Sequence, residues 1–397
     1  MPLSNLPDLS GRTILQVIPA LQAGGAERTV IEVSDAIVRA GGRALVASAG
    51  GRMLDELAAV GGGHIQLNAE RKNPLTIWQN GSKLAQLVKT EQVSLIHARS
   101  RAPGWSAYRA AQQTGTPFVT TYHGAYSGLR GPKRTYNSVM AKGDRVIANS
   151  RWMAEHIAEV HKLGPDQIII IPRGVDFETF DPEQVEDARL ARIRETWGLG
   201  PDNQRIVLFL PARLTEWKGQ KLALEALAGL SARERERLVL VMTGEAKRKS
   251  SYVSELNEMV ERHGLLDATR IQGHCADMPA ALMTADIVLA PSTRPEAFGR
   301  TAAEAAAMGR PVIAADHGGA RETVVDGETG ARFTPGDAQA LTGAIRSLVS
   351  VGATTRDTMG QNGRLYIKQH FSAAGLQAAT LSLYTALIRT RRPTLNE

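Results

Sequence analysis

The feature that most constrains the fold is an alternation of short β-branched runs with longer amphipathic segments, which begins near residue 12 and recurs about every thirty residues. Such a period predicts βα units and a parallel sheet, because a parallel strand pair needs a helical crossover between its strands. In the first half the sequence predicts strands at 13–18, 43–48, 64–67, 93–97, 117–122, 145–148 and 168–171, and helices at 26–40, 75–89, 104–113 and 151–161.

The second half repeats this plan. It predicts strands at 205–210, 238–243, 270–272, 287–290 and 311–314, with helices at 220–230, 252–263, 278–283 and 301–308. The 397 residues, 43% of them hydrophobic and 22% charged, are enough for two globular cores. We therefore expect an α/β chain of two Rossmann-like, doubly wound parallel-sheet domains that face a central cleft. The expected parts are an N-terminal domain (1–178), a connector (179–203), a C-terminal domain (204–373) and a last helix (374–397) that packs back on the first domain.

Several classes of protein are disfavoured by composition. The single cysteine, Cys275, leaves no internal disulfide and no CxxC metal or redox motif. No apolar run reaches the roughly 18 residues of a membrane span, and the first residues lack the cationic and apolar regions of a signal peptide. These observations predict a cytoplasmic protein.

The most informative stretch runs from Ser292 to Gly330 and contains Glu296 and Glu304. An alanine-rich run that ends at Gly309 predicts a helix beginning near Phe298 or Gly299. The first amides of a helix lack internal acceptors, so those of Phe298, Gly299, Arg300 and Thr301 form a candidate seat for a phosphate. One glutamate on either side of that seat suits the hydroxyls of a sugar and of a ribose. The alternative is that each glutamate is solvated or supports an i,i+4 pair on an ordinary helix.

Other candidate binding residues follow predicted strands, where ligands bind in doubly wound sheets. Gly24 and Gly25 follow the first strand and allow close approach of a phosphate or sugar, although a tight turn explains them equally well. Arg213 and Lys218 follow the first strand of the second half and could offset the charge of a departing diphosphate, or could simply face solvent. Gly244, after the next strand, could lie beside a base and ribose.

His123 follows the strand at 117–122, and this position makes it a candidate for catalysis as well as for a structural role. There is no GxGxxG, no P-loop and no GxSxG motif. His and acidic residues do not cluster at metal-ligand spacing, so no metal and no cofactor beyond a co-substrate is predicted.

Taken together, the motifs at 24–28, 123–124, 172–176, 213–219 and 296–313 resemble family 4 of the retaining nucleotide-sugar glycosyltransferases, in the family's order and over nearly the whole chain. The resemblance implies the GT-B fold, with the donor bound mainly by the C-terminal domain. Arg173 is a departure, because the family usually has Asn in this PRGVD loop, and it leaves the role of that loop open.

The resemblance also implies roles for individual residues. Arg213 and Lys218 would hold the diphosphate, helped by the amides of 298–301 and by the Gly24-Gly25 loop. Glu304 would bind the ribose, Glu296 the donor hexose, and His123 the transferred sugar. The family's favoured scheme is front-face attack in which the leaving phosphate oxygen accepts the acceptor's proton, so no protein base is required.

The acceptor is suggested by charge. Residues 97–152 carry nine Lys or Arg against one acid, Asp144, in a chain of net charge +7. By resemblance, such a basic first domain serves a lipid-linked or lipopolysaccharide acceptor, with residues 130–142 as a contacting helix. The sequence thus predicts a peripheral enzyme at the inner face of the cytoplasmic membrane, bound to anionic lipid and not to nucleic acid.

Three alternatives stay open. A nucleotide-sugar epimerase on the same fold would alter the sugar instead of forming a glycoside. A nucleic-acid-binding protein would explain the basic segment, but that segment has no recognised module and few aromatic residues for base stacking. A non-catalytic binder on this fold is the third alternative, disfavoured because every expected donor contact is present.

Overall fold

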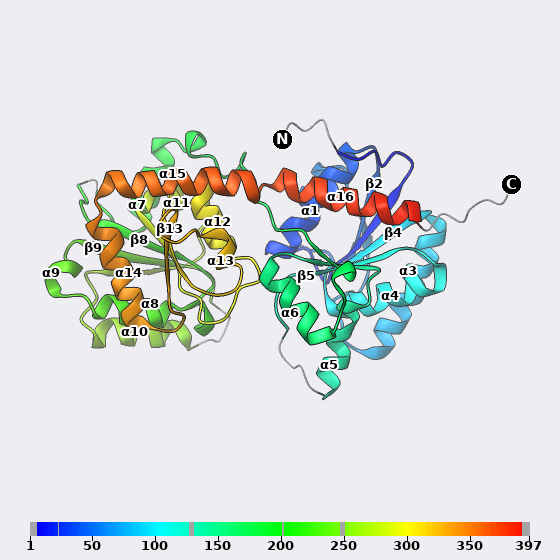
Figure 1. The fold of residues 1–397 in the computed structure, drawn as a ribbon, viewed down its shortest axis with the longest axis horizontal. Helices are drawn as coiled ribbons and strands as arrows, with labels where there is room; N and C mark the ends of the chain where they lie inside the picture. Colours follow the sequence, from blue (N-terminus) through cyan, green and yellow to red (C-terminus); the bar gives the residue numbers. More distant parts are fainter. Residues whose placement is uncertain (1–5, 23, 127–130, 201, 247–250, 391–397) are drawn as a thin grey trace. The chain divides into compact units, whose positions relative to one another are not determined.

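The computed structural model describes residues 6–22, 24–126, 131–200, 202–246 and 251–390. The chain forms two compact units: unit 1 comprises residues 1–174 and 373–397, and unit 2 comprises residues 175–372. Each unit has its own parallel sheet (Figure 1). The chain leaves unit 1 after Gly174, slightly before the predicted boundary at 178, and residues 179–203 lie within unit 2.

Unit 1 is built on a seven-stranded parallel sheet in the order β3-β2-β1-β4-β5-β6-β7. Its strands are β1 (Thr13–Val17), β2 (Arg43–Ser48), β3 (Gly63–Gln66), β4 (Val93–Ala98), β5 (Phe118–Tyr122), β6 (Arg145–Ala148) and β7 (Ile168–Ile170). Its helices are α1 (Gly25–Arg39), α2 (Leu54–Ala59), α3 (Pro74–Thr90), α4 (Arg101–Thr114), α5 (Gly131–Asn137), α6 (Arg151–His161) and α16 (Ala373–Thr390).

The central strands of unit 1, such as β1 and β4, bury both faces, as central strands of a doubly wound sheet must. Successive residues point to opposite faces, so Ile14 packs with α1 and α16 whereas Leu15 packs with α3 and α4. Leu95 and Ile96 divide in the same way on β4. The sheet is therefore sandwiched between α1 with α16 on one face and α3 with α4 on the other.

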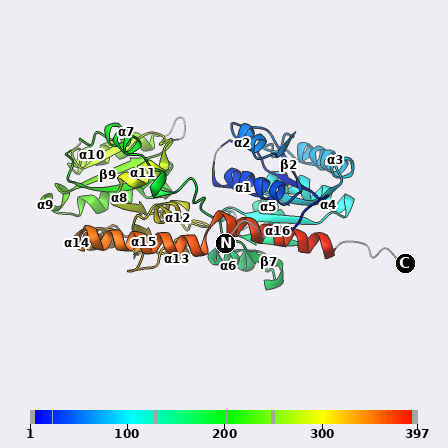
Figure 2. The same cartoon turned by 90° about the horizontal axis from the view of Figure 1, so that it is seen from above.

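The C-terminal helix α16 is fastened to unit 1 by buried polar contacts, and both Figure 1 and Figure 2 show it beside α1. The ring of His97, on β4, lies between two hydroxyls, with Nδ1 2.6 Å from Tyr384 Oη and Nε2 2.7 Å from Thr121 Oγ1. Gln377 Nε2 donates to the Glu32 carbonyl at 2.8 Å. Buried polar groups of this kind are costly unless each is satisfied, so the contacts specify how α16 docks.

Unit 2 repeats the design with a six-stranded parallel sheet in the order β10-β9-β8-β11-β12-β13. Its strands are β8 (Ile206–Pro211), β9 (Leu238–Thr243), β10 (Thr269–Gln272), β11 (Ile287–Ala290), β12 (Val312–Ala315) and β13 (Gly330–Phe333). Its helices are α7 (Asp187–Thr196), α8 (Gln220–Ala228), α9 (Ala232–Arg235), α10 (Tyr252–Arg262), α11 (Met278–Thr284), α12 (Arg300–Ala307), α13 (Ala320–Thr323), α14 (Ala338–Ser350) and α15 (Ala353–His370).

Two apolar layers cover the unit 2 sheet. Leu208 and Leu210 face α8, α10 and α14, while Val207 and Phe209 face α7, α11 and α12. Trp197, which follows α7, is 1% exposed, and its ring centroid lies 4.9 Å from that of Phe209 with the two rings tilted by 38°. The segment 179–203, predicted as a connector, is thus part of the unit 2 core, because its buried Trp197 packs directly on a central strand.

The predicted α/β architecture of parallel sheets is confirmed. The sequence missed β13, the long helices α14 and α15, and the short helices α2, α9 and α13. The expected contacting helix at 130–142 is α5 followed by a 3-10 turn (Ser138–Ala141), and Arg130 lies outside the described residues. None of the helices within the described ranges is both long and apolar enough to cross a bilayer.

His97 makes unit 1 sensitive to acid. Burial, followed by the nearby Arg99 and His123, lowers the pKa of His97 well below its usual value. The unfolded chain, with a His pKa of ~6.5, then binds more protons than the folded chain below that pH, so stability falls on acidification by up to about 1.4 kcal/mol per pH unit for this group.

We expect His97→Gln, which keeps hydrogen-bonding atoms on both sides but does not titrate, to show a flatter dependence of the urea midpoint on pH between 7.5 and 5.5 than the wild type. The exposed His263→Gln serves as the control. Equal slopes in wild type and His97→Gln would contradict a neutral, buried His97.

Candidate active site

The loop that carries Glu296 lies at the carboxyl edge of the unit 2 sheet, between β11 and α12. Glycines of other loops hold it by close backbone contact. A Cβ on Gly219 would lie 2.0 Å from the Pro291 carbonyl oxygen, and one on Gly319 would lie 2.4 Å from the backbone of Phe298. The Gly319 N–H donates to the Glu296 carbonyl at 2.8 Å. Such contacts leave no room for side chains, so this loop is fixed from both sides.

Glu296 and Lys218, predicted separately, form an ion pair. Lys218 Nζ lies 2.7 Å from Glu296 Oε1, and the side chains are only 12% and 20% exposed. The Ser292 hydroxyl donates to the same Oε1. Glu296 Oε2 accepts no hydrogen bond from any described residue. The arrangement leaves Glu296 Oε2 available to a ligand. This oxygen lies beside Lys218, whose positive charge the carboxylate already partly compensates.

The start of α12 is where the sequence predicts a seat for an anion. Gly299 precedes the helix in the left-handed region, at φ +83°, and α12 begins at Arg300. The Thr301 hydroxyl donates at 3.2 Å to the carbonyl of Pro211, the last residue of β8. This bond anchors the start of α12 at the edge of the sheet. The first amides of the helix have no acceptor within the helix itself.

Glu304 lies one turn into α12 and contacts Arg300. Arg300 Nε and Nη2 lie 2.8 Å and 2.5 Å from Glu304 Oε1, and the Glu304 side chain is 16% exposed. This is the i,i+4 pair that the sequence offered as the alternative to ribose binding. A ribose would have to share Glu304 with Arg300, so the structure leaves ribose binding by Glu304 as a prediction.

Three other predicted donor-binding residues of unit 2 differ in environment. Phe298 is 3% exposed, with its ring 5.5 Å from that of Phe371, so only its backbone is available to a ligand. Gly244 lies where a Cβ would be 2.0 Å from the Ala212 carbonyl oxygen, which explains the glycine by backbone packing. Arg213 is exposed, and its guanidinium makes no hydrogen bond or ion pair with the described residues.

The glycine pair of unit 1 lies at the carboxyl end of β1. Gly24 has φ +145° and precedes α1, which begins at Gly25. The loop before it is tied to the turn after β2, because the Leu21 N–H donates to the Gly50 carbonyl at 2.8 Å and the Met53 N–H donates to the Leu21 carbonyl at 2.9 Å. Arg52 Nε also donates to the Gln22 carbonyl at 2.8 Å, so backbone and side-chain bonds together hold the loop before the glycines.

His123 follows β5 at the same edge of the unit 1 sheet and contacts Arg173, which follows β7. Arg173 Nη2 lies 2.8 Å from His123 Nδ1. Burial, then the charge of Arg173 and that of Arg99, lowers the pKa of His123 well below its usual value. The imidazole is therefore neutral at physiological pH.

The structure adds three polar residues that the sequence did not single out. Ser292 joins the Lys218–Glu296 pair, and its place four residues before Glu296 in the same loop was the available signal. Arg99 is 3% exposed and hydrogen-bonds to Gln16. Asn149 is 1% exposed, directly follows β6, and neither of its amide atoms has a hydrogen-bond partner in the described chain. Strand-end position, the signal used for His123, applied to Arg99 and Asn149 as well.

No cluster of three or more His, Cys, Asp or Glu side chains suitable for a metal ion occurs within the described ranges. The independence from metal that the sequence predicts stays a prediction.

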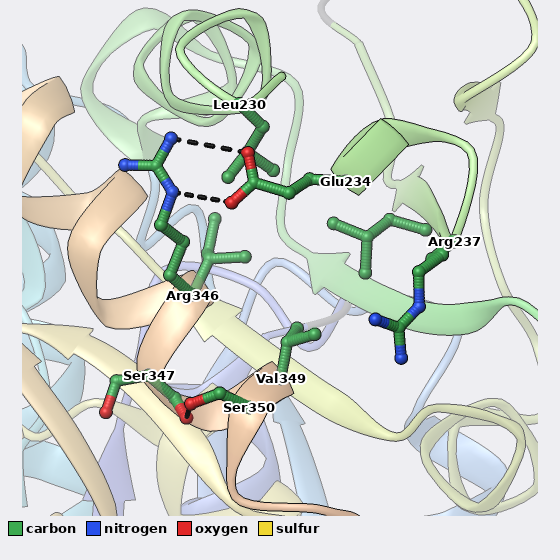
Figure 3. Close-up of a pocket in the computed structure, with 9 residues that line it drawn as sticks. Leu230, Glu234, Arg237, Arg346, Ser347, Val349 and Ser350 are labelled. Atoms are coloured by element: carbon green, nitrogen blue, oxygen red, sulfur yellow. Dashed lines mark hydrogen bonds and ion pairs between the residues drawn. The ribbon is translucent and has the colours of Figure 1, made fainter. Parts of the chain in front are cut away.

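A hollow of about 470 Å³ lies elsewhere in unit 2 (Figure 3). Its lining includes Arg237 and Leu238, at the amino end of β9, and Arg346, which is paired with Glu234 at 2.7 Å. Ligands of doubly wound sheets bind beyond the carboxyl ends of the strands. This hollow is therefore not the candidate active site.

Comparison with known proteins finds one family model for each half of the chain. Residues 23–179 match the family model described as Glycosyltransferase Family 4, and residues 192–366 match that described as Glycosyl transferases group 1.

Two relatives are named D-inositol 3-phosphate glycosyltransferases. The protein from Catenulispora acidiphila is 30% identical over 75% of this chain and 72% of its own length. The protein from Xylanimonas cellulosilytica is 31% identical over 59% of this chain and 58% of its own length, so the match spans less than two thirds of that relative.

Solved structures are similar over almost the whole chain. A glycosyltransferase from Rickettsia africae is 33% identical with a TM-score of 0.87, covering 95% of this chain and 99% of that one. HepE from Anabaena, in complex with UDP and glucose, has a TM-score of 0.79 at 24% identity, covers 94% and 100% of the two chains, and supports the fold alone. Matches to both family models, a 30% identical relative and a 33% identical structure place this chain in glycosyltransferase family 4, with the GT-B type of fold.

Proposed function

We propose that this chain is a retaining glycosyltransferase that moves a hexose from a nucleotide-diphosphate sugar to an acceptor without a metal ion. The observation that carries the proposal is the Lys218–Glu296 pair beside the first turn of α12, which offers a cation, a carboxylate oxygen and the start of a helix at one edge of a sheet. That HepE was solved with UDP and glucose supports a nucleotide sugar as the donor.

In this proposal each group has a separate task. Lys218, Arg213 and the amides at 298–301 offset the negative charge that grows on the diphosphate as it departs. Glu296 Oε2 accepts hydrogen bonds from hexose hydroxyls, and Glu304 binds the ribose. Gly24 and Gly25 allow close backbone approach to the donor, and Gly244 borders its nucleoside. His123 binds an oxygen of the transferred sugar.

The reaction that suits these groups is front-face substitution. The bond from the anomeric carbon to the diphosphate oxygen breaks, and a bond to the acceptor oxygen forms on the same face. The acceptor's proton passes to the departing phosphate oxygen, so no protein base takes it.

A two-step experiment tests the proposal. A thermal-shift screen with UDP-, GDP- and ADP-hexoses should raise the melting temperature for one base, because a ligand at 100 times its Kd stabilises the folded state by about 2.7 kcal/mol. Incubation of that donor with candidate glycan and inositol phosphate acceptors should give a glycoside whose anomeric configuration, determined by NMR coupling constants, matches the donor's. A product of inverted configuration, or an altered free sugar without glycoside, would sink the proposal.

The ion pair makes the roles of its two members separable. Glu296→Gln keeps the shape of the side chain and its contact to Ser292 but removes the charge. We expect kcat to fall on the order of 10²-fold. Nucleotide diphosphate should bind at least as tightly as in the wild type, because Lys218 is released from its carboxylate. Lys218→Ala should weaken nucleotide diphosphate binding roughly 10- to 100-fold and transfer as well. Calorimetry and initial rates measure both.

Lys221→Ala is the matched control, because Lys221 forms an ordinary pair with Glu255 at 2.7 Å only three residues further along. It should leave both quantities near the wild-type values. Equal losses of nucleotide affinity in the Glu296 and Lys218 variants would contradict the division of roles.

We further propose that the acceptor is lipid-linked or otherwise presented at an anionic membrane face, such as a lipopolysaccharide precursor, and that the 97–152 segment contacts the membrane. Not all of its cations are available for this, since Arg99 is buried and Arg101 hydrogen-bonds to Asn137 at 2.9 Å. The exposed cations in the described part of the segment are Lys133, Arg134, Lys142 and Arg151.

The membrane proposal predicts co-flotation with vesicles containing anionic lipid at low salt, and loss of binding as salt shortens the Debye length. Lys133→Glu/Arg134→Glu should lower the partition coefficient by roughly thirtyfold or more, at about 1 kcal/mol per cation removed. Arg192→Glu/Arg194→Glu on α7, an equal change of charge at exposed positions of unit 2, is the control. No flotation of the wild type at low salt would remove the membrane proposal without touching sugar transfer.

A further inference from the structure

The contact between Arg173 and His123 determines which nitrogen of the imidazole carries hydrogen. Arg173 Nη2 and His123 Nδ1 are 2.8 Å apart. A guanidinium has only donors and stays protonated in proteins, so the nitrogen facing it must be the acceptor. Nδ1 is therefore bare, and a neutral ring carries its hydrogen on Nε2.

The surroundings of His123 oppose a second proton. Arg173 after β7 and Arg99 after β4 are cationic, and the third titratable neighbour, His97 on β4, is itself buried. The other elements around it contribute only uncharged groups to the small cavity that His123 lines: Thr29 from α1, Thr121 from β5, Asn149 after β6 and Thr380 from α16. No carboxylate lines that cavity within the described residues. A proton on Nδ1 would also abolish the bond to Arg173 and place two cations in contact.

The hydrogen on Nε2 has no acceptor. Nε2 is buried, with no hydrogen-bond partner in the described part of the chain, and both amide atoms of Asn149 are in the same condition. Both residues line one cavity of about 10 Å³, the space of a single water molecule. Buried donors are almost always satisfied. No described side chain satisfies this one, and the cavity suits the oxygen of a water molecule or of a ligand.

We propose that Arg173 is a positioning residue that holds His123 as the neutral Nε2–H tautomer, so that His123 acts as a hydrogen-bond donor to an oxygen of the transferred sugar and never as a base. The identity of the oxygen rests on the proposed sugar transfer; the tautomer does not. No proton is exchanged at His123, and this agrees with a reaction in which the leaving phosphate takes the acceptor's proton. The arginine that departs from the family's usual asparagine thus has a definite task.

The tautomer can be read directly with protein labelled by 15N at its nine histidines. Long-range 1H–15N correlation spectra distinguish the Nε2–H tautomer, the Nδ1–H tautomer and the imidazolium, and His123→Gln identifies the His123 signals. We expect the wild type to show Nε2–H for His123 from pH 8 to pH 5.5 without titration. Arg173→Met should give a mixture of tautomers and an onset of protonation at higher pH, and Arg173→Lys should restore the wild-type pattern.

A wild-type Nδ1–H pattern, an imidazolium at pH 7, or an unchanged pattern in Arg173→Met would overturn the proposal, whatever the activity. Arg43→Met is the matched control, because it removes an exposed arginine that pairs with Glu91 at the amino end of β2. Melting temperatures show that each variant is folded.

Transfer assays then decide the role of the donor hydrogen. Arg173→Met should lower kcat about tenfold, leave nucleotide diphosphate affinity unchanged and add an acid limb to the pH profile of kcat, whereas Arg173→Lys and Arg43→Met should keep the wild-type profile. If Arg173→Met gives the expected spectra but an unchanged kcat, His123 does not donate a hydrogen bond to the transferred sugar, and that part of the proposal is refuted. If no nucleotide sugar is transferred by the wild type, the proposed function fails while the spectra still decide the tautomer.

Discussion

The candidate donor site depends on how closely backbones can approach at the carboxyl edge of the unit 2 sheet. Gly219, Gly244 and Gly319 each occupy a position where a Cβ would be 2.4 Å or less from the backbone of another loop. Loops that touch backbone to backbone have little freedom. That constraint brings Lys218, from the segment after β8, to within 2.7 Å of Glu296, from the loop after β11, although the residues are 78 positions apart. The ion pair is thus a result of the packing of the loops, and it is positioned before any ligand arrives.

The carboxyl edge of the unit 1 sheet differs, because there Arg99 and Arg173 hydrogen-bond to uncharged acceptors. Arg99 binds the carbonyl oxygen of the Gln16 side chain, and Arg173 binds an imidazole nitrogen. Burying a charge is expensive, and a neutral acceptor recovers only part of the lost hydration. A cationic edge of this kind favours an electron-rich ligand, and it keeps the histidines beside it neutral.

The sequence predicted the α/β architecture because the spacing of apolar residues differs between strands and helices. This spacing is a local pattern, and it reflects which faces of each element are buried. The limits of strands such as β8 and β9 were predicted within one or two residues. Both strands contain β-branched residues, and a glycine follows each: Gly244 directly after β9, and Gly219 after the turn that follows β8. The helix α14 was open to prediction, because Leu341, Ile345 and Leu348 follow helical spacing, whereas α15 buries Gly360 and Gly363 and has few apolar positions. Their place in unit 2 depends on contacts such as Ile345 with the sheet. Gly299 delayed the start of α12 to Arg300, because its left-handed conformation lies outside the helix.

For the site, residue types at strand ends were sufficient to select Lys218, Glu296 and His123, but not to show their partners. Nothing in the sequence relates Lys218 to Glu296 or His123 to Arg173, since both contacts join segments about fifty or more positions apart that meet only when the sheet forms. The Arg300–Glu304 contact was open to prediction, because helical spacing alone brings those side chains together.

The docking of α16 on α1 has a consequence for synthesis on the ribosome. Unit 1 takes its last helix from the far end of the chain, so the apolar face formed by Ile14, Leu95 and Val119 and the imidazole of His97 stay uncovered while residues 175–372 are made. At ~5–20 residues per second that interval lasts roughly 10 to 40 s. Much of unit 2 can leave the ribosome during this time, whereas unit 1, begun first, is completed only afterwards. The nascent chain therefore presents an unfinished apolar surface while unit 2 is translated, and this surface is a candidate binding site for a chaperone.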